Sequence, residues 1–213
     1  MTRNNPEILA PVGGAEQLTA ALRCGADAVY FGLQNFNARR NASNFNGDDL
    51  AETIRKCHIH SCRVYITVNT IVFDDELVDA YKTVDQAVNA GADALIVQDL
   101  AIAEYAKEHY PKLKLIASTQ MAVHNSEGVK ALQKMGFDRI VLARELSFDE
   151  IKKNNSGDRS RYGSICSRGA LYVFVRKLLF VFNDRRTVRK QGLLCSAMQT
   201  GLQCKWQGIC VIS

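Results

Sequence analysis

Short runs of β-branched and aliphatic residues alternate with longer amphipathic stretches along the first two-thirds of the chain. Six apolar runs predict strands: EILAP (7–11), AVYFGL (28–33), RVYITVN (63–69), ALIVQD (94–99), KLIAS (114–118) and RIVLAR (139–144). Continuous apolar runs of this length are typical of strands buried on both faces. The intervening stretches have helical spacing: AEQLTAALRC, DDLAETIRKC, DELVDAYKTVDQAVNA, LAIAEYAKEHY and SEGVKALQKM. The pattern therefore predicts βα units in series.

The turns from helix to strand repeat a glycine, in C-G-A-D-A at Gly25, A-G-A-D-A at Gly91 and M-G-F-D-R at Gly136. Glycine is the residue that most readily takes the left-handed conformation that ends many helices. Six βα units require right-handed crossovers and a parallel sheet, either doubly wound or part of a barrel. No predicted strand is followed by a glycine-rich phosphate loop. We therefore predict an α/β fold, an incomplete (β/α)8 TIM-like barrel of six βα units with an aberrant C-terminal tail.

Polar residues follow each of the last five predicted strands. In such barrels the chemistry lies at the carboxyl ends of the strands and in the loops that follow them. We predict a substrate pocket there, and the alternative is that these side chains cap helices or form a structural polar layer. The candidates are Asn37 and Arg39 after the second strand, Asn69 after the third, Asp99 after the fourth, Gln120 and His124 after the fifth, and Arg144 and Glu145 after the sixth.

Two other groups of reactive side chains receive less weight. CHIHSC (57–62) holds two cysteines and two histidines, but its spacing does not match known zinc sites. It also lies at the amino-terminal end of the third strand, so we predict no metal site. His124 stands beside Asn125 and Ser126, where it is equally typical of a helix cap. No G-x-S-x-G or H-E-x-x-H motif accompanies it, and the catalytic residues stay unassigned.

The composition is that of a globular protein, with 213 residues of which 47% are hydrophobic and 23% charged. The charge is uneven, because residues 159–213 hold ten of the 27 Lys and Arg but one of the 22 Asp and Glu. The start of the chain lacks the apolar run of a secretory signal, and no run approaches the roughly 18 residues of a membrane span. We expect a cytoplasmic protein without membrane contact, with Cys24, Cys57 and Cys62 reduced.

Residues 5–156 resemble the collagenase-like peptidase family, family U-thirty-two. The resemblance is carried by PEILAPVGGAEQLTAALRCGADAVYFG, FNARRNASNF, VYITVNT, ALIVQDLA, ASTQMAVHN and IVLARELSFDEI in this order. It implies a barrel-type fold and a pocket to which Asn69, Asp99, Gln120, Arg144 and Glu145 contribute. In the family, the sixth strand and its helix are followed by E-x-F-x-x-G-A-L-C and then by a cysteine-rich segment, S-G-N-R-G-x-C-A-Q-P-C-R. The sequence of this chain contains neither motif.

The tail becomes similar to the missing segment when it is read in another frame, with the last two bases of each codon joined to the first base of the next. Met198 followed by Gln199 then forces a cysteine, and Lys190 followed by Gln191 allows only Asn or Ser. One permitted reading from Gly163 to Thr200 is EVFVHGALCMCxSGNCxxSSMIGGRSGNRGxCAQPCR. We therefore predict a barrel portion at 1–157 and an out-of-frame tail, not a domain, at 158–213. The alternative is a genuine basic tail that binds RNA.

The resemblance implies two classes of activity. The family label is peptidase, while several members are associated with hydroxylation of tRNA or rRNA bases, or of a quinone ring, and hold an iron–sulfur cluster through cysteines of the missing segment. It therefore implies an RNA or peptide substrate in intact relatives, and a cluster in those relatives only. We expect no cofactor and no activity in this chain, a third reading being a non-catalytic pseudoenzyme. The sequence does not indicate the oligomeric state.

Overall fold

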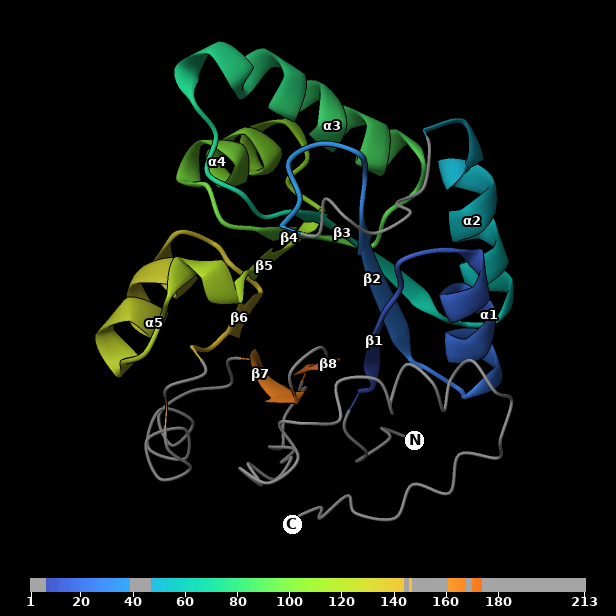
Figure 1. The fold of residues 1–213 in the computed structure, drawn as a ribbon. Helices are drawn as coiled ribbons and strands as arrows, with labels where there is room; N and C mark the ends of the chain where they lie inside the picture. Colours follow the sequence, from blue (N-terminus) through green and yellow to red (C-terminus); the bar gives the residue numbers. More distant parts are fainter. Residues whose placement is uncertain (1–6, 39–46, 144–145, 147–160, 168–169, 174–213) are drawn as a thin grey trace.

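The computed structural model describes residues 7–38, 47–143, 146, 161–167 and 170–173. Six parallel strands pair in chain order, each with the next, and curl into part of a barrel (Figure 1). This is the predicted α/β architecture. The strands are β1 (Leu9–Pro11), β2 (Ala28–Gly32), β3 (Arg63–Val68), β4 (Ala94–Val97), β5 (Lys114–Ala117) and β6 (Arg139–Val141).

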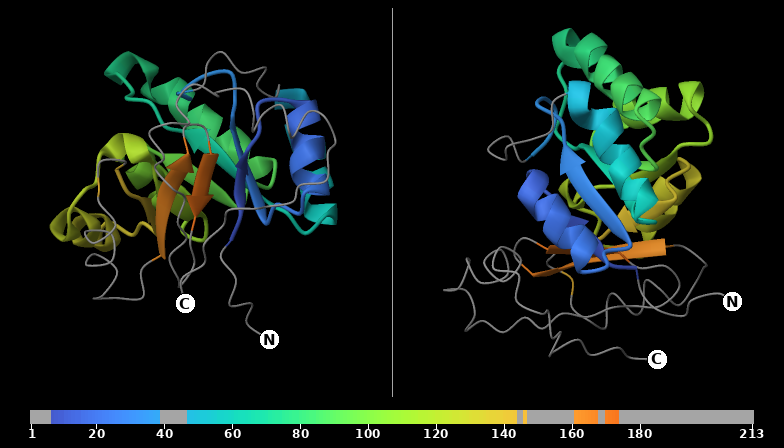
Figure 2. Two further views of the ribbon diagram at one scale, coloured as in Figure 1. Left: turned by 60° about the horizontal axis from the view of Figure 1, so that its bottom comes forward. Right: turned by 90° about the vertical axis from the view of Figure 1, so that its right-hand side faces the viewer.

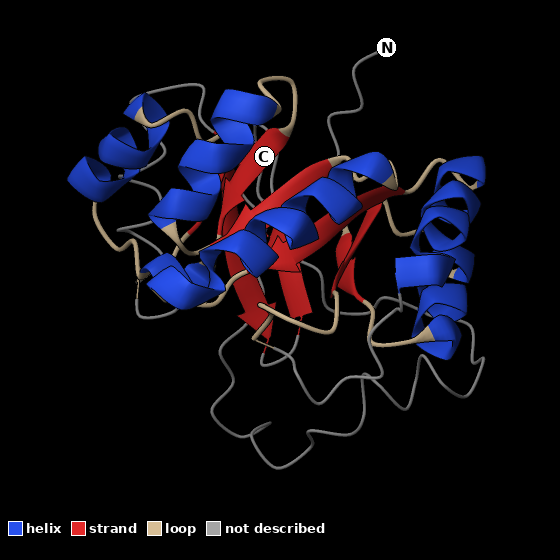
Figure 3. Cartoon of the chain, turned by 90° about the horizontal axis from the view of Figure 1, so that it is seen from above, coloured by secondary structure: helices blue, strands red, loops and turns tan. Residues whose placement is uncertain are grey.

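A helix follows each of the first five strands and returns the chain to the amino-terminal edge of the sheet. Seen from above, the helices lie along the outside of the curved sheet (Figure 3). They are α1 (Ala15–Arg23), α2 (Gly47–Ile59), α3 (Leu77–Asn89), α4 (Leu100–His109) and α5 (Ser126–Lys134), with short 3-10 turns η1 (Asp74–Glu76) and η2 (Thr119–Met121). The carboxyl ends of the strands and their loops thus share one edge, which we name the mouth.

The two faces of the sheet bury separate apolar clusters. Side chains on the outer face pack against the helices and include Val29, Ile66 and Leu115. Side chains on the inner face form a smaller cluster of Leu9, Ala28, Tyr30, Tyr65, Ala94, Ile96, Ile116 and Val141. Because successive side chains alternate between faces, the residues two positions beyond this inner cluster also face inward, at the mouth.

Four helices end in the same turn. In α1, α2, α3 and α5, a residue with positive φ follows the helix, and the next amide donates to a carbonyl five residues earlier. The backbone amide of the residue with positive φ itself donates to a carbonyl three residues earlier. Together these two bonds form the Schellman motif, which satisfies carbonyls that the helix leaves free. Gly25, Gly91 and Gly136 take the left-handed position as predicted, at φ 74°, 95° and 86°. In α2 the position is held by Ser61, at φ 56°.

An aspartate after three of these turns joins neighbouring strands. The carboxylate of Asp27 accepts a hydrogen bond from the Ile8 amide at 2.8 Å, and the Asp27 amide donates to the Ile8 carbonyl at 3.0 Å. Asp93 makes the same pair of bonds with Val64, and Asp138 makes it with Leu115. Each aspartate therefore fixes the start of an odd-numbered strand to the start of the next strand, and we name these contacts the aspartate latches.

A buried ionic layer closes the inner face at the amino-terminal edge. Glu7, 5% exposed, accepts hydrogen bonds from the Tyr65 hydroxyl at 2.6 Å and from Arg139 at 2.9 Å, and pairs with Arg63 at 3.1 Å. Arg139 lies 5.8 Å from the centre of the Tyr65 ring, and its second terminal nitrogen has no hydrogen-bond partner. Burial, and then the charge of Glu7, raises the pKa of Tyr65. We assign this layer a role in the stability of the barrel, since it lies opposite the mouth.

Two further strands continue the sheet beyond β6. β7 (Arg161–Ser167) pairs in parallel with β6, and β8 (Ala170–Val173) pairs antiparallel with β7. Figure 2 shows this pair beside β1, and β8 contacts β1. Both strands come from the segment that we predict to be out of frame. The sixth strand, β6, is therefore not an edge of this sheet.

Candidate functional site at the mouth

Asn69 directly follows β3 and joins three segments of the mouth. Its backbone N–H donates to the Phe36 carbonyl at 2.9 Å, and its side-chain oxygen accepts a hydrogen bond from the Ala38 backbone N–H at 3.1 Å. Its side-chain nitrogen donates to the Ser118 hydroxyl at 3.4 Å. Asn69 therefore fixes the loop after β2 and reaches the end of β5.

The loop after β2 is held in a tight conformation. Phe36 has φ 57°, which is rare for a bulky residue and costs roughly 1–3 kcal/mol unless the surroundings compensate. Asn37 is buried, and its side chain donates to the Leu33 carbonyl. A Cβ atom on residue 32 would collide with the Asn37 side chain, so the loop needs glycine there. The predicted site residue Asn37 is thus part of the wall that supports the mouth.

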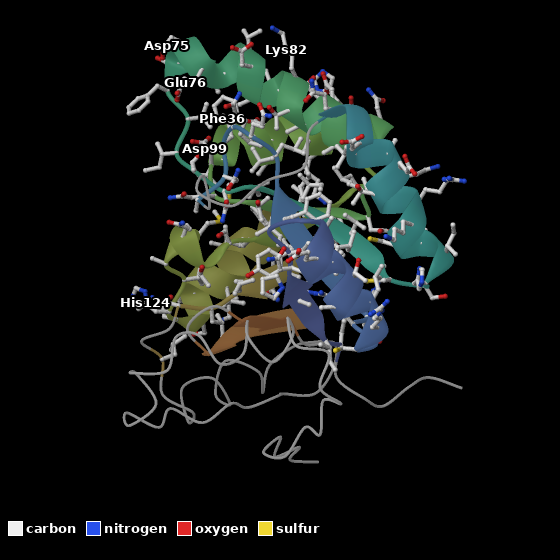
Figure 4. The ribbon with its side chains drawn as sticks, turned by 45° about the vertical axis from the view of Figure 1, so that its right-hand side comes forward. Phe36, Asp75, Glu76, Lys82, Asp99 and His124 are labelled. Atoms are coloured by element: carbon white, nitrogen blue, oxygen red, sulfur yellow. The ribbon has the colours of Figure 1, made fainter. Side chains whose placement is uncertain are left out.

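Asp99 begins α4, and both of its carboxylate oxygens are engaged. One oxygen accepts from the Ala101 amide at 2.9 Å and thereby caps the helix. The other accepts from the Val72 amide at 3.2 Å and holds the loop after β3. Figure 4 shows Asp99 near the loops that carry Phe36 and η1. The carboxylate is a structural acceptor in this arrangement, which matches the helix-cap alternative more closely than a role as a general base.

The end of β5 supplies hydroxyl and amide groups. Ser118, 2% exposed, accepts from the Gln120 amide at 3.3 Å and caps η2. Gln98, which follows β4, donates to the Gln120 carbonyl at 3.5 Å. The side-chain amide of Gln120 is itself exposed. Sequence reasoning missed Ser118 and Gln98, although the alternation from Ile116 and Ile96 places both on the inner face.

The remaining candidates are separate from this group. His124 is exposed, and its Nδ1 contacts the Ala122 carbonyl at 2.9 Å within its own loop. In Figure 4 it lies well away from Phe36 and Asp99. Arg39, Arg144 and Glu145 lie outside the described residues. The structure thus brings together the loops that carry Asn37, Asn69, Asp99 and Gln120. His124 is not part of this group.

An open groove extends from residues at the mouth to the end of α5. Its volume is about 490 Å³, and it contains Asp99 and Gln120 of the predicted pocket. Its full lining is Ile71, Gln98, Asp99, Leu100, Gln120, Met121, Leu132 and Met135.

The described residues do not fit a metal ion or an iron–sulfur cluster. They contain no group of three or more His, Cys, Asp or Glu that could hold a metal. Burial raises the pKa of Cys57 to about 11 and that of Cys62 to about 12. The two cysteines instead occupy the apolar contact positions of the Schellman turn after α2, where α1 and α3 have pairs of alanines.

The model of Peptidase family U32 matches residues 13–173. The chain belongs to this family. The match confirms the resemblance found in the sequence, and it extends through β8, beyond the boundary at 157 that we predict for the barrel portion.

Curated U32 relatives carry two kinds of name. The chain is 42% identical over 146 residues to a 23S rRNA 5-hydroxycytidine synthase of Escherichia coli (strain K12), covering 68% of this chain and 22% of that protein. It is 38% identical to a collagenase of Porphyromonas gingivalis, covering 71% and 36%. It is 33% identical to tRNA hydroxylation protein P of Escherichia coli, covering 95% and 44%. The chain thus spans less than half the length of these relatives.

The U32 peptidase Mk0906 has a similar fold. It superposes with a TM-score of 0.63 at 13% identity, over 95% of this chain and 82% of its own. At this identity the likeness shows the fold alone, and it confirms the TIM-like architecture. None of the helices that the structure describes has the length and apolarity that a membrane span requires.

Proposed function

We propose that this chain forms the substrate-binding part of a U32 protein that hydroxylates RNA, and that the mouth accepts a base of tRNA or rRNA. The observation that carries the proposal is the set of neutral amides at the mouth, from Asn69, Gln98 and Gln120, with the buried Ser118 hydroxyl holding Asn69 in place. Amides offer a donor and an acceptor side by side, which suits the edges of bases. Relatives named for rRNA and tRNA hydroxylation support this choice.

Proteolysis is the second candidate, because the family description and the collagenase relative name it. A peptidase needs an activated nucleophile or a metal-bound water. Among the described residues, Cys57 and Cys62 are buried thiols with raised pKa, His124 is bound to its own loop, and both oxygens of Asp99 are engaged. This arrangement supports recognition of a polar ligand more than it supports peptide cleavage.

The proposal separates binding from catalysis. The described residues offer no ligand set for a cluster or metal. We propose that the chain binds RNA in the cytoplasm, and we assign no hydroxylation step to the described residues. RNA binding at the mouth should depend only weakly on salt, since residues 1–158 carry more Asp and Glu than Lys and Arg. Any binding by the basic residues 159–213 should instead weaken strongly as the salt concentration rises.

The test compares RNA binding by the full chain and by two matched variants. Asn69→Leu removes the amide that links the loop after β2 to Ser118, whereas Asn89→Leu makes the same change at an exposed position at the end of α3. We expect fluorescence anisotropy with labelled bulk tRNA to show about tenfold weaker binding for Asn69→Leu and no change for Asn89→Leu. Cleavage of gelatin that Asn69→Leu abolishes, without tRNA binding by the natural chain, would favour the peptidase instead.

A further inference from the structure

The groove on the rim of the mouth exposes apolar side chains that a globular protein usually buries. Ile71 is 65% exposed, and Leu100 and Met135 are each 49% exposed. They come from the loop after β3, from the start of α4 and from the end of α5. Exposed apolar side chains from three separate segments therefore line one groove. The volume of about 490 Å³ lies within the range of small-ligand sites.

The polar side chains that line the groove are the amides of Gln98 and Gln120 and the carboxylate of Asp99. Gln98 makes one long hydrogen bond through its side chain, at 3.5 Å to the Gln120 carbonyl, and the Gln120 side chain is exposed. Asp99 carries the one carboxylate in the lining. Both of its oxygens already accept hydrogen bonds from backbone N–H groups. The groove therefore presents two adaptable amides without a charge that is free to pair with a phosphate or an ammonium group. A neutral ligand with donors and acceptors along its edge matches this chemistry.

The apolar walls favour a flat ring. Met121 and Met135 both line the groove, and methionine sulfur makes favourable contacts with aromatic rings. Leucine and isoleucine side chains complete the walls, so a ring can be covered on its faces while its edge meets the glutamines. A nucleobase combines a neutral aromatic ring with such an edge, whereas an apolar peptide side chain would leave the two amides without partners.

We propose that this groove binds an unpaired nucleobase of the RNA, next to the base that enters the mouth. This inference rests on the proposed function, because it assigns the neighbouring base of the same substrate. Gln98 and Gln120 contact the edge of the base, and Met121 and Met135 contact its ring. The groove then selects single-stranded over paired RNA, since a base within a duplex cannot leave its stack without an unpairing cost.

The experiment uses a labelled single-stranded hexauridylate and the same oligonucleotide with abasic positions. Gln98→Leu/Gln120→Leu removes both amides, and Gln86→Leu makes the same change at an exposed position of α3 outside the groove. Base stacking and edge contacts predict about tenfold weaker binding of hexauridylate to the double variant, and no loss for Gln86→Leu. The abasic oligonucleotide should bind the natural chain and the double variant equally. Crosslinks from 4-thiouridine should fall within residues 98–100 or 120–135.

The outcomes separate the two proposals. Equal hexauridylate binding by the double variant and the natural chain, with Asn69→Leu still weakened towards tRNA, would overturn the groove assignment and leave the mouth assignment intact. Failure of the natural chain to bind either RNA would overturn both. An apolar peptide could instead compete with hexauridylate for the groove. If this competition required Leu100 and Met135 and was unchanged in the Gln98→Leu/Gln120→Leu variant, the groove would be a peptide site and the inference would be overturned.

Discussion

The left-handed residue after α2 provides a direct test of how the helix ends are stabilised. Ser61 holds φ 56° in a turn whose counterparts use glycine at Gly25, Gly91 and Gly136. Its side chain is exposed, so a replacement there changes mainly the backbone energy. We predict that Ser61→Gly stabilises the protein, and that Gly25→Ser destabilises it by the same mechanism.

The magnitude follows from two opposing effects. The left-handed conformation costs an L-residue roughly 1–2 kcal/mol, which glycine does not incur. Glycine also makes the unfolded chain freer, which removes about 0.4–1 kcal/mol of stability. The net gain for Ser61→Gly is therefore about 0.5–1 kcal/mol, equivalent to a rise of about 2 °C in Tm for a chain of this size. At Gly25 no atom lies within 4 Å of an added Cβ, so the loss there reflects conformation alone.

Urea denaturation followed by far-ultraviolet circular dichroism measures both changes. The midpoint should rise for Ser61→Gly and fall for Gly25→Ser, with unchanged slopes. Gly136→Ser provides a contrast, because an added Cβ there meets Lys107 Cε at 3.0 Å and adds a steric cost. The reasoning would be refuted by a lower midpoint for Ser61→Gly, since the Ser61 side chain would then contribute more than its backbone strain.

Three other predictions concern the ionic layer, the thiols and the tail. Glu7→Gln should destabilise the protein by about 3–5 kcal/mol in the same assay, because it leaves the buried Arg139 uncompensated, whereas Lys130→Met, at an exposed pair, should change nothing measurable. The raised pKa of Cys57, about 11 against 9.0, means that the unfolded chain loses this proton first as the pH rises. The stability should therefore fall between pH 9 and 11, and Cys57→Ala should reduce the slope, while an unchanged slope would contradict the burial of this thiol. Finally, the nucleotide sequence should show that one inserted or deleted base near codons 156–160 restores the family signature. A Leu171 codon that does not end in G would exclude this reading frame.

The continuous apolar runs were sufficient to predict the α/β architecture and its six parallel strands. The run KLIAS (114–118) contains β5 (Lys114–Ala117), and RVYITVN (63–69) contains β3 (Arg63–Val68). Buried parallel strands appear in the sequence as continuous apolar runs because both of their faces are apolar. The glycines at the helix ends were equally visible, whereas Ser61 was not, because serine carries no conformational signal for positive φ.

The sequence indicates which polar residues follow the strands, but it does not indicate their contacts. Asn69, Asp99 and Gln120 follow their strands as local sequence indicates. The partners that define their roles come from other loops: Ala38 for Asn69 and Val72 for Asp99. Such contacts depend on the curvature of the sheet, which a local pattern does not encode. The same holds for the groove, since Met135 reaches it from the far end of α5.

The aspartate latches have a consequence for the order in which the barrel forms. Each latch joins residues that are 19, 29 or 23 positions apart, and each lies within one pair of consecutive strands. A nascent chain could therefore complete the first pair before the third strand leaves the ribosome, and then repeat the step twice. Closing short loops is entropically cheaper than closing long ones. We expect vectorial folding in three increments, so that translation pauses after each pair of strands would cost this fold little.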